Sequence, residues 1–146
     1  MTIIQEQISP EGVYHADTGI TAQEWLQMLN DGTIKQRQKE ILLCFYREPE
    51  HKGICNVLAK KYGGNDKHFS NPIWRIGKAV QKRLARFEVH GVENDGSSSN
   101  DSVFWVVPMT GKREKQGFCW MIKPELCVAL EQYLYHNLIS IYKNAA

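Results

Sequence analysis

The sequence predicts an α+β fold that is mainly helical, and three features lead to this prediction. Amphipathic stretches with good capping residues fill most of residues 21–86, two segments rich in β-branched and aromatic residues follow, and a long helix lies at the end. The chain has 146 residues, of which 42% are hydrophobic, so it can bury one core. We expect an irregular N-terminal arm over residues 1–20 and a single domain over residues 21–143.

Composition argues against a membrane protein. No run approaches the roughly 18 apolar residues of a membrane span, and the first residues lack the basic start and apolar stretch of a signal peptide. We therefore expect a cytoplasmic protein without a membrane partner. The four cysteines (Cys44, Cys55, Cys119 and Cys127) form no C-x-x-C pair and have apolar neighbours, so we expect buried free thiols rather than a disulfide or a zinc site.

Two capping boxes predict the first helices. The motif T-A-Q-E at residues 21–24 should start a short helix that ends near residue 32. The motif T-I-K-Q at residues 33–36 offers a second box for a helix over residues 34–47, which the following Glu-Pro pair ends.

Positive charge is concentrated in one segment, Lys60–Arg86. This segment holds eight Lys or Arg and one acid, so its formal charge is +7, whereas the whole chain carries only +2 and all other residues therefore sum to −5. Such concentration favours contact with a polyanion. Residues 1–34 hold five acids and no Lys or Arg, so we expect them to face away from a nucleic acid or toward another protein.

The basic segment has a helix-turn-helix pattern. A helix over residues 53–63 should end at a glycine pair, and after a loop the basic helix should start with Asn71 as cap and Pro72 as its first residue; Ser70 is the alternative cap. On this helix Arg75, Lys78, Lys82 and Arg86 form a cationic stripe opposite the apolar one, with Trp74 and Gln81 beside it. The simpler alternative is a solvated basic face, which is common on surface helices.

The second half of the chain predicts a β-hairpin and a last helix. A mobile polar loop over residues 93–102 precedes a strand at 102–107, a polar connection and a returning strand at 118–122. A third strand at 88–92 is an option, and a helix over 124–142 follows.

Three helices followed by a β-hairpin form the plan of a winged helix-turn-helix domain, with a two- or three-stranded wing at 102–122 and a long C-terminal helix. We expect it to bind double-stranded DNA, with Arg75 a candidate for a two-point contact to guanine. Packing under the wing explains Trp74 as well as a base contact does, and Trp105 and Trp120 fit a core role at least as well as a functional one. The expected DNA-contacting residues are His68, Ser70, Asn71, Trp74, Arg75, Lys78, Gln81, Lys82, Arg86, Lys112, Arg113 and Lys115.

Catalytic groupings are missing from the sequence. It has no phosphate-binding loop, no H-E-x-x-H, no G-x-S-x-G and no dinucleotide motif. A loop salt bridge explains Asp66 beside His68 more simply than acid–base chemistry, and no residues at ligand spacing accompany His68. We therefore expect a binding module rather than an enzyme, with no cofactor and no metal.

An ordered set of motifs carries a family resemblance over residues 21–135. It comprises T-x-x-E-W-x-x-x-L, L-A-x-K-Y-G-G, an aromatic residue and Asn before a G-K-x-[IV] helix, W-x-V-P-x-x-G, G-F-x-W and P-E-L-x-x-A-L. These stretches include Thr21–Leu29, Leu58–Gly64, Phe69–Arg83, Phe104–Gly111, Gly117–Ile122 and Pro124–Leu130.

The set resembles a DNA-reading module that accompanies modification-dependent, Mcr-type restriction systems. The resemblance implies recognition of duplex DNA with a modified base such as 5-methylcytosine, on behalf of a nuclease or motor domain or subunit. The chain departs from the pattern at Phe104-Trp105, where a tryptophan pair is expected, and in a longer loop at 93–101. Two alternatives stay open: a sequence-specific transcription regulator that dimerises through the last helix, and a protein-interaction subunit of a defence system.

Overall fold

The computed structural model describes the backbone of residues 1–93 and 95–145 and the side chains of 1–93 and 95–137. Its helices are α1 (Ala22–Asn30), α2 (Gln36–Arg47), α3 (Cys55–Tyr62), α4 (Asp66–Leu84) and α5 (Pro124–Ala145), with a 3-10 turn at Pro49–His51. Its strands are β1 (Thr2–Gln5), β2 (Gln7–Ile8), β3 (Val13–His15), β4 (Lys52–Ile54), β5 (Phe87–Val92), β6 (Ser98–Ser102), β7 (Met109–Glu114) and β8 (Gly117–Ile122). The α+β prediction is confirmed for these residues.

The first predicted capping box is confirmed and the second is wrong. At the start of α1, the Thr21 side chain accepts from the Glu24 N–H at 3.1 Å and the Glu24 carboxylate accepts from the Thr21 N–H at 3.0 Å. At α2 the cap is Lys35, because the Thr33 N–H and hydroxyl both bond to the Asp31 carboxylate in the preceding turn. An aspartate that closes such a turn takes up the threonine hydroxyl, which is then not available to cap the helix.

The basic helix begins earlier than predicted. Its cap is Asn65, whose side chain accepts from the His68 N–H at 3.1 Å, so neither Asn71 nor Ser70 is the cap and Pro72 lies inside the helix. A proline there removes one helical hydrogen bond and is unfavourable by about 3 kcal/mol. Burial of Phe69 in the added turns offsets this loss, since that side chain is 1% exposed.

The predicted wing is shorter than expected. Residues 102–107 do not form the first strand of the hairpin; Phe104–Val107 make a helix-like turn in which the Val107 N–H donates to the Phe104 carbonyl. The hairpin consists of β7 and β8, paired from Met109↔Ile122 to Glu114↔Gly117. The loop predicted over 93–102 contains β6.

The predicted arm over residues 1–20 is also wrong, because it contributes β1, β2 and β3. Strand β1 pairs in parallel with β5, the predicted optional third strand, and β5 pairs with β6. The second sheet has the order β2-β3-β7-β8-β4. The Lys123 ammonium donates to the Ala16 carbonyl at 2.6 Å and so fastens the end of this N-terminal segment to the start of α5.

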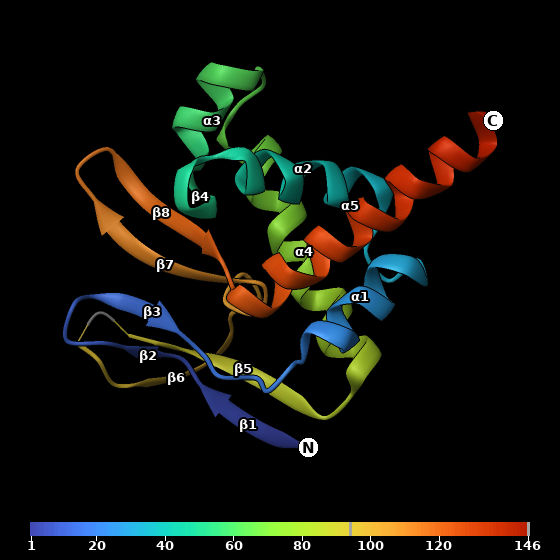
Figure 1. Cartoon of the computed structure of the whole chain (residues 1–146). Coiled ribbons are helices and arrows are strands. Elements are labelled where there is room, and N and C mark those ends of the chain that lie inside the picture. The colour runs from blue at the N-terminus through green and yellow to red at the C-terminus, as the bar shows by residue number, and fades with distance from the viewer. Residues whose placement is uncertain (94, 146) are drawn as a thin grey trace.

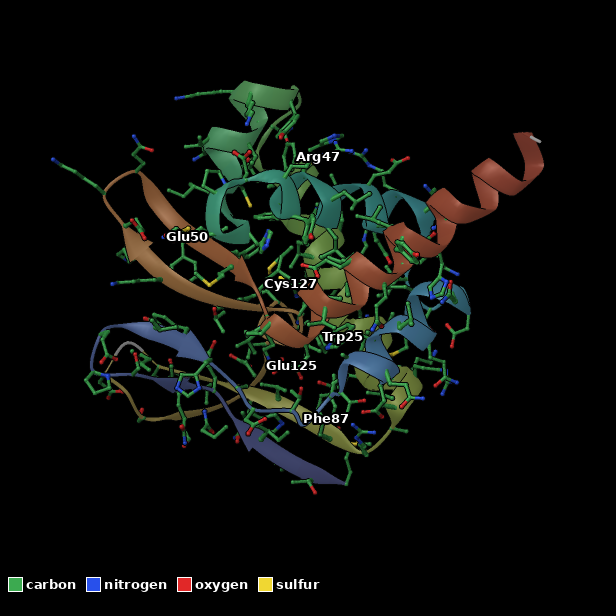
Figure 2. All side chains as sticks on the ribbon, in the orientation of Figure 1. Trp25, Arg47, Glu50, Phe87, Glu125 and Cys127 are labelled. Carbon is green, nitrogen blue, oxygen red and sulfur yellow. The ribbon has the colours of Figure 1, made fainter. Side chains whose placement is uncertain are left out.

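Figure 1 shows the helices gathered on one side of the molecule and the two sheets on the other, with α3 near the tip of the β7–β8 hairpin. The core lies between them and includes Ile73, Ile76 and Val80 of α4, each with no exposed area. Trp25 of α1 and Phe87 at the start of β5 are buried in the same core (Figure 2). None of the helices over the described residues is long and apolar enough to cross a membrane.

Gly77 allows the turn at residues 104–107 to lie directly on α4. A Cβ added to Gly77 would lie 1.9 Å from the Phe104 carbonyl oxygen, a distance that no side chain tolerates. The turn therefore contacts the helix backbone, and only glycine permits that approach.

We predict that Gly77→Ala lowers the free energy of unfolding by about 2 kcal/mol, because an overpacking cost of about 3 kcal/mol outweighs the roughly 1 kcal/mol that alanine gains over glycine within a helix. Urea unfolding followed by circular dichroism measures the change. Gly91→Ala is the matched control, since its added Cβ would meet its nearest neighbour at 3.6 Å. A Gly77→Ala protein as stable as the parent would contradict the close contact with Phe104.

Candidate nucleic-acid interface

The exposed side of α4 carries a row of cations, Arg75, Lys78 and Lys82, which we call the α4 ridge. At 100° per residue these three side chains lie on the helix side opposite Ile73, Ile76 and Val80. None of the three makes an ion pair with any described residue. The ridge therefore presents three uncompensated positive charges to solvent, as the helical pattern predicted.

Arg86 does not belong to this ridge, which corrects the predicted stripe. The helix ends at Leu84, and Ala85 takes a left-handed conformation with φ of 51°. Arg86 then makes a two-point contact with Glu24 of α1, with Nη2 2.9 Å from Oε1. The acidic segment of residues 1–34 thus neutralises the end of the basic segment, and Arg83 likewise lies 3.5 Å from Asp31.

Trp74 stands at one edge of the ridge. Its side chain is 43% exposed, its ring meets Phe104 edge-on with centroids 4.9 Å apart, and the Lys78 ammonium lies 5.3 Å from the ring centroid. The ring is held from two sides yet keeps an open surface. This arrangement is compatible both with packing against the turn at residues 104–107 and with contact to a base.

The other residues of the basic segment that were predicted to contact DNA differ in their exposure and in the contacts they already make within the protein. Asn71 is exposed, Ser70 is half-buried, and the His68 ring contacts the Arg37 guanidinium of α2. The Gln81 side chain accepts from the Val89 N–H at 3.2 Å, so it holds the start of β5 beside the helix. Asn71 is therefore the neutral polar side chain that the fold leaves open next to the ridge.

The hairpin cations Lys112, Arg113 and Lys115 are all exposed, but they do not share one face. Side chains alternate along β7, so Lys112 lies over the cavity lined by Lys52 and Met121, whereas Arg113 lies on the opposite face. The Arg113 guanidinium is 5.8 Å from the Phe118 ring centroid. Lys115 is in the two-residue turn between β7 and β8.

The hairpin tip and the α3–α4 turn border a common groove. Its lining includes Asn56 and Lys60 of α3, Asn65 and Asp66 at the start of α4, and Gln116 from the tip, around a volume of about 840 Å³. The tip of the hairpin thus reaches the turn between α3 and α4.

A second concave feature was not predicted from the sequence. Glu6, Tyr14 and Arg113, with the aromatic rings of Trp105, Phe118 and Trp120, surround a cavity of about 270 Å³, which we call the aromatic pocket. Sequence reasoning assigned Glu6 and Tyr14 to an irregular arm and therefore missed their approach to the hairpin. The signal available was the cluster of aromatic residues in the W-x-V-P and G-F-x-W motifs.

No three His, Cys, Asp or Glu side chains of the described residues lie close enough together to hold a metal ion. The four cysteines are free thiols, and burial raises the pKa of Cys55 to about 12 and that of Cys127 to about 11.

Comparisons with family models, with curated proteins and with solved structures find no match to this chain.

The ion pair between Glu24 and Arg86 should be visible in the pH dependence of stability. The Arg86 guanidinium and the Thr21 backbone N–H lower the pKa of Glu24 from 4.5 to about 2. The pair is 27% and 43% exposed, so solvent screening keeps its contribution modest. Because the pKa is lower in the folded protein, the stabilisation is complete above pH 4.5 and is lost as the pH falls toward 2.

We predict that Glu24→Gln lowers the free energy of unfolding by about 1 kcal/mol at pH 7, because glutamine retains the capping box but not the charge. Denaturant unfolding between pH 7 and pH 3 should show the difference shrink as the pH falls. Glu93→Gln removes an exposed carboxylate that makes no ion pair with a described residue, and serves as control. A difference that stays constant over this range would argue against the ion pair.

Proposed function

We propose that this chain is a winged helix-turn-helix specificity domain that binds double-stranded DNA and recognises a modified base, 5-methylcytosine, for a modification-dependent restriction system. The observation that carries the proposal is the α4 ridge: three exposed cations that make no ion pair with a described residue, on the second helix of a helix-turn-helix. A helix with this distribution of charge suits the major groove, where cations reach phosphates and base edges.

The topology supports the winged-helix part of the proposal. Helices α2, α3 and α4 take the places of the three helices of such a domain, and β4 lies between the first two. Strand β4 pairs with β8, which pairs with β7, so the short strand joins the hairpin that serves as the wing. Strands β5 and β6 are an insertion between the recognition helix and the wing, and β2 and β3 extend the sheet beyond it.

Electrostatics supports binding to duplex DNA rather than to acidic surfaces in general. The chain as a whole carries only +2, and its own acids neutralise Arg83 and Arg86, so within residues 72–86 the cations that make no ion pair with a described residue are the three of the α4 ridge. A narrow row of cations fits one groove of a duplex and its flanking phosphates. The modified base itself rests on the resemblance of the motif set to Mcr-associated modules, and cleavage would belong to a partner nuclease or motor domain.

We predict that removing the ridge weakens DNA binding and its salt dependence together. The variant Arg75→Ala/Lys78→Ala/Lys82→Ala should reduce the slope of log K against log salt by about 2.7, since each phosphate contact contributes about 0.9. Fluorescence anisotropy of a labelled duplex at several salt concentrations measures this slope.

The matched control is Arg47→Ala, which removes an exposed cation from the end of α2 (Figure 2). Its salt slope should equal that of the parent. If the triple variant retains DNA as well as the parent does, the ridge faces an acidic protein and the chain is an interaction subunit instead.

We predict that a duplex with 5-methylcytosine binds about tenfold more tightly than the identical unmethylated duplex, because one base-level contact contributes roughly 1–3 kcal/mol of discrimination. Titration of both duplexes at two salt concentrations separates this preference from phosphate binding. Equal affinities would remove the modified base from the proposal and leave duplex binding intact. Preference for an unmodified palindrome, together with a dimer in sedimentation, would support a transcription regulator.

A further inference from the structure

Acidic side chains are collected on the sheet formed by β1, β5 and β6, which we call the acidic sheet. Residues 1–34 and 87–111 hold five and four of the 16 acids of the chain and none of its 18 Lys or Arg. The second group lies on β5, on β6 and in the connection between them, and comprises Glu88, Glu93, Asp95 and Asp101. None of these four makes an ion pair with a described Lys or Arg. The sheet is therefore a negative surface that attracts a basic partner.

Strand β1 forms one edge of the acidic sheet, and alternate backbone groups of this strand point away from it. The strand order is β1-β5-β6, so β5 is the strand that pairs with β1 among the described residues. The N–H groups of Thr2 and Glu6 donate toward β5, at 3.3 and 2.8 Å. Since backbone groups alternate in direction along a strand, the N–H and C=O groups of Ile3 and Gln5 are directed outward. In Figure 1, β1 forms the lower border of the molecule.

The side chains of β1 leave this edge open. Ile3 is 61% exposed, and the strand T-I-I-Q has no charged residue and no proline, which are common protections of an edge. The Gln5 side chain donates to the Gly91 carbonyl at 2.5 Å, so it lies toward β5 and not over the free edge. The opposite edge differs, because β6 carries Asp101 and its register against β5 is interrupted. An added strand therefore fits β1 better than β6.

The register of the acidic sheet places a carboxylate beside the open edge. Ile3 is paired with Glu88 of β5, and directly paired residues carry their side chains on the same side of a sheet. Phe87 and Val89 are buried in the core, so Ile3 and Glu88 lie on the outer side, where the Glu88 side chain is 45% exposed. A lysine in an added strand would lay its apolar stem on Ile3 and bring its ammonium to Glu88, about 10 Å or two strand spacings away.

Charge distinguishes among three kinds of occupant for this edge. DNA is repelled by the carboxylates of the acidic sheet and has no peptide backbone for strand pairing. A second copy of this chain would bring two acidic sheets together, and like charges across an interface are unfavourable. A peptide segment rich in Lys or Arg meets opposite charge on the sheet. The occupant that fits is therefore a protein with an extended basic segment.

We propose that the open edge of β1 binds an extended segment of a partner protein, rich in Lys or Arg, which adds a strand to the acidic sheet. Backbone hydrogen bonds to Ile3 and Gln5 supply the pairing, and the carboxylates of the sheet select a basic sequence. This inference goes beyond the proposed function and does not depend on DNA binding at α4. Neither β1 nor the four acids belong to the α4 ridge, so both surfaces can be tested in one molecule.

The probe is a fluorescein-labelled peptide, Lys-Val-Lys-Val-Lys-Val-Lys, whose lysines would lie on the outer side of an added strand. Fluorescence anisotropy at low salt measures its affinity for the parent protein. We expect Ile3→Pro to weaken binding about tenfold, because proline replaces the outward N–H by a ring and leaves the bonds to β5 in place. Ile3→Val keeps the N–H and an apolar side chain, and is the matched control. Thermal unfolding confirms that each variant is folded.

Selection of a basic sequence is tested at Glu88. The variant Glu88→Gln should weaken binding of the basic peptide about threefold, which is the effect of one ion pair screened by solvent. Glu40→Gln removes an exposed carboxylate from α2 and should leave the affinity unchanged. An acidic peptide with glutamate in place of each lysine should not bind the parent protein.

Methylation of the peptide backbone separates strand addition from simple attraction between charges. One modified peptide carries N-methyl groups on its lysine nitrogens, and another carries them on its valine nitrogens. Only one set of N–H groups faces β1: the lysine set in an antiparallel strand and the valine set in a parallel one. Methylation of that set alone should abolish binding, and the sensitive set reports the direction of the added strand.

The outcomes keep this inference apart from the proposed function. Equal binding of the unmodified and both methylated peptides, or loss of binding with both methylated ones, would overturn strand addition. A parent protein that does not bind the basic peptide would also overturn it, whatever its affinity for DNA. A dimer in sedimentation that Ile3→Pro abolishes, without peptide binding, would assign the edge to a second copy instead. Peptide binding that is sensitive to Ile3→Pro, in a protein that fails to bind DNA, would support this inference and overturn the proposed function.

Discussion

Burial of one side of α4 is the constraint on which the rest of the structure depends. Phe69, Ile73, Ile76 and Val80 have almost no exposed area, and α2, α3 and β5 all contact this helix. Once that side is buried, the 3.6-residue period of the helix places Arg75, Lys78 and Lys82 on the opposite, exposed side. The orientation of the cations is thus a consequence of hydrophobic packing and needs no contact of their own.

Acidic side chains of the protein also neutralise part of its positive surface. Glu24 and Asp31, on α1 and just after it, pair with Arg86 and Arg83 near the end of α4. These pairs fasten the acidic segment of residues 1–34 to the basic segment Lys60–Arg86. These pairs are partly exposed, so they orient the elements more than they stabilise them. A shorter row of free cations lowers indiscriminate attraction to nucleic acid, which favours readout by shape and base contacts.

Local signals were enough to predict part of this architecture. The Thr21 capping box, the α4 period and the second hairpin strand all depend on residues close together in sequence, and these predictions agree with the structure. Features that depend on distant partners were missed: Arg86 meets a carboxylate 62 positions away, and the turn at Phe104 forms because Gly77 admits it. Pro72 misled the prediction because tertiary burial overrides its usual preference for a helix start. The approach of Glu6 to the hairpin was also missed, since no sequence pattern indicates that the N-terminal strand pairs with β5.

That parallel pairing of β1 with β5 has a consequence for how the chain comes to be folded. The Gln5 side chain donates to the His90 carbonyl, 85 positions later, so the first strand has no neighbour until most of the polypeptide has been made. Closing so long a loop is entropically unfavourable and slow compared with forming local helices. The N-terminal strand, and with it the Glu6 wall of the aromatic pocket, should be among the last parts to assemble on a helical framework that already exists.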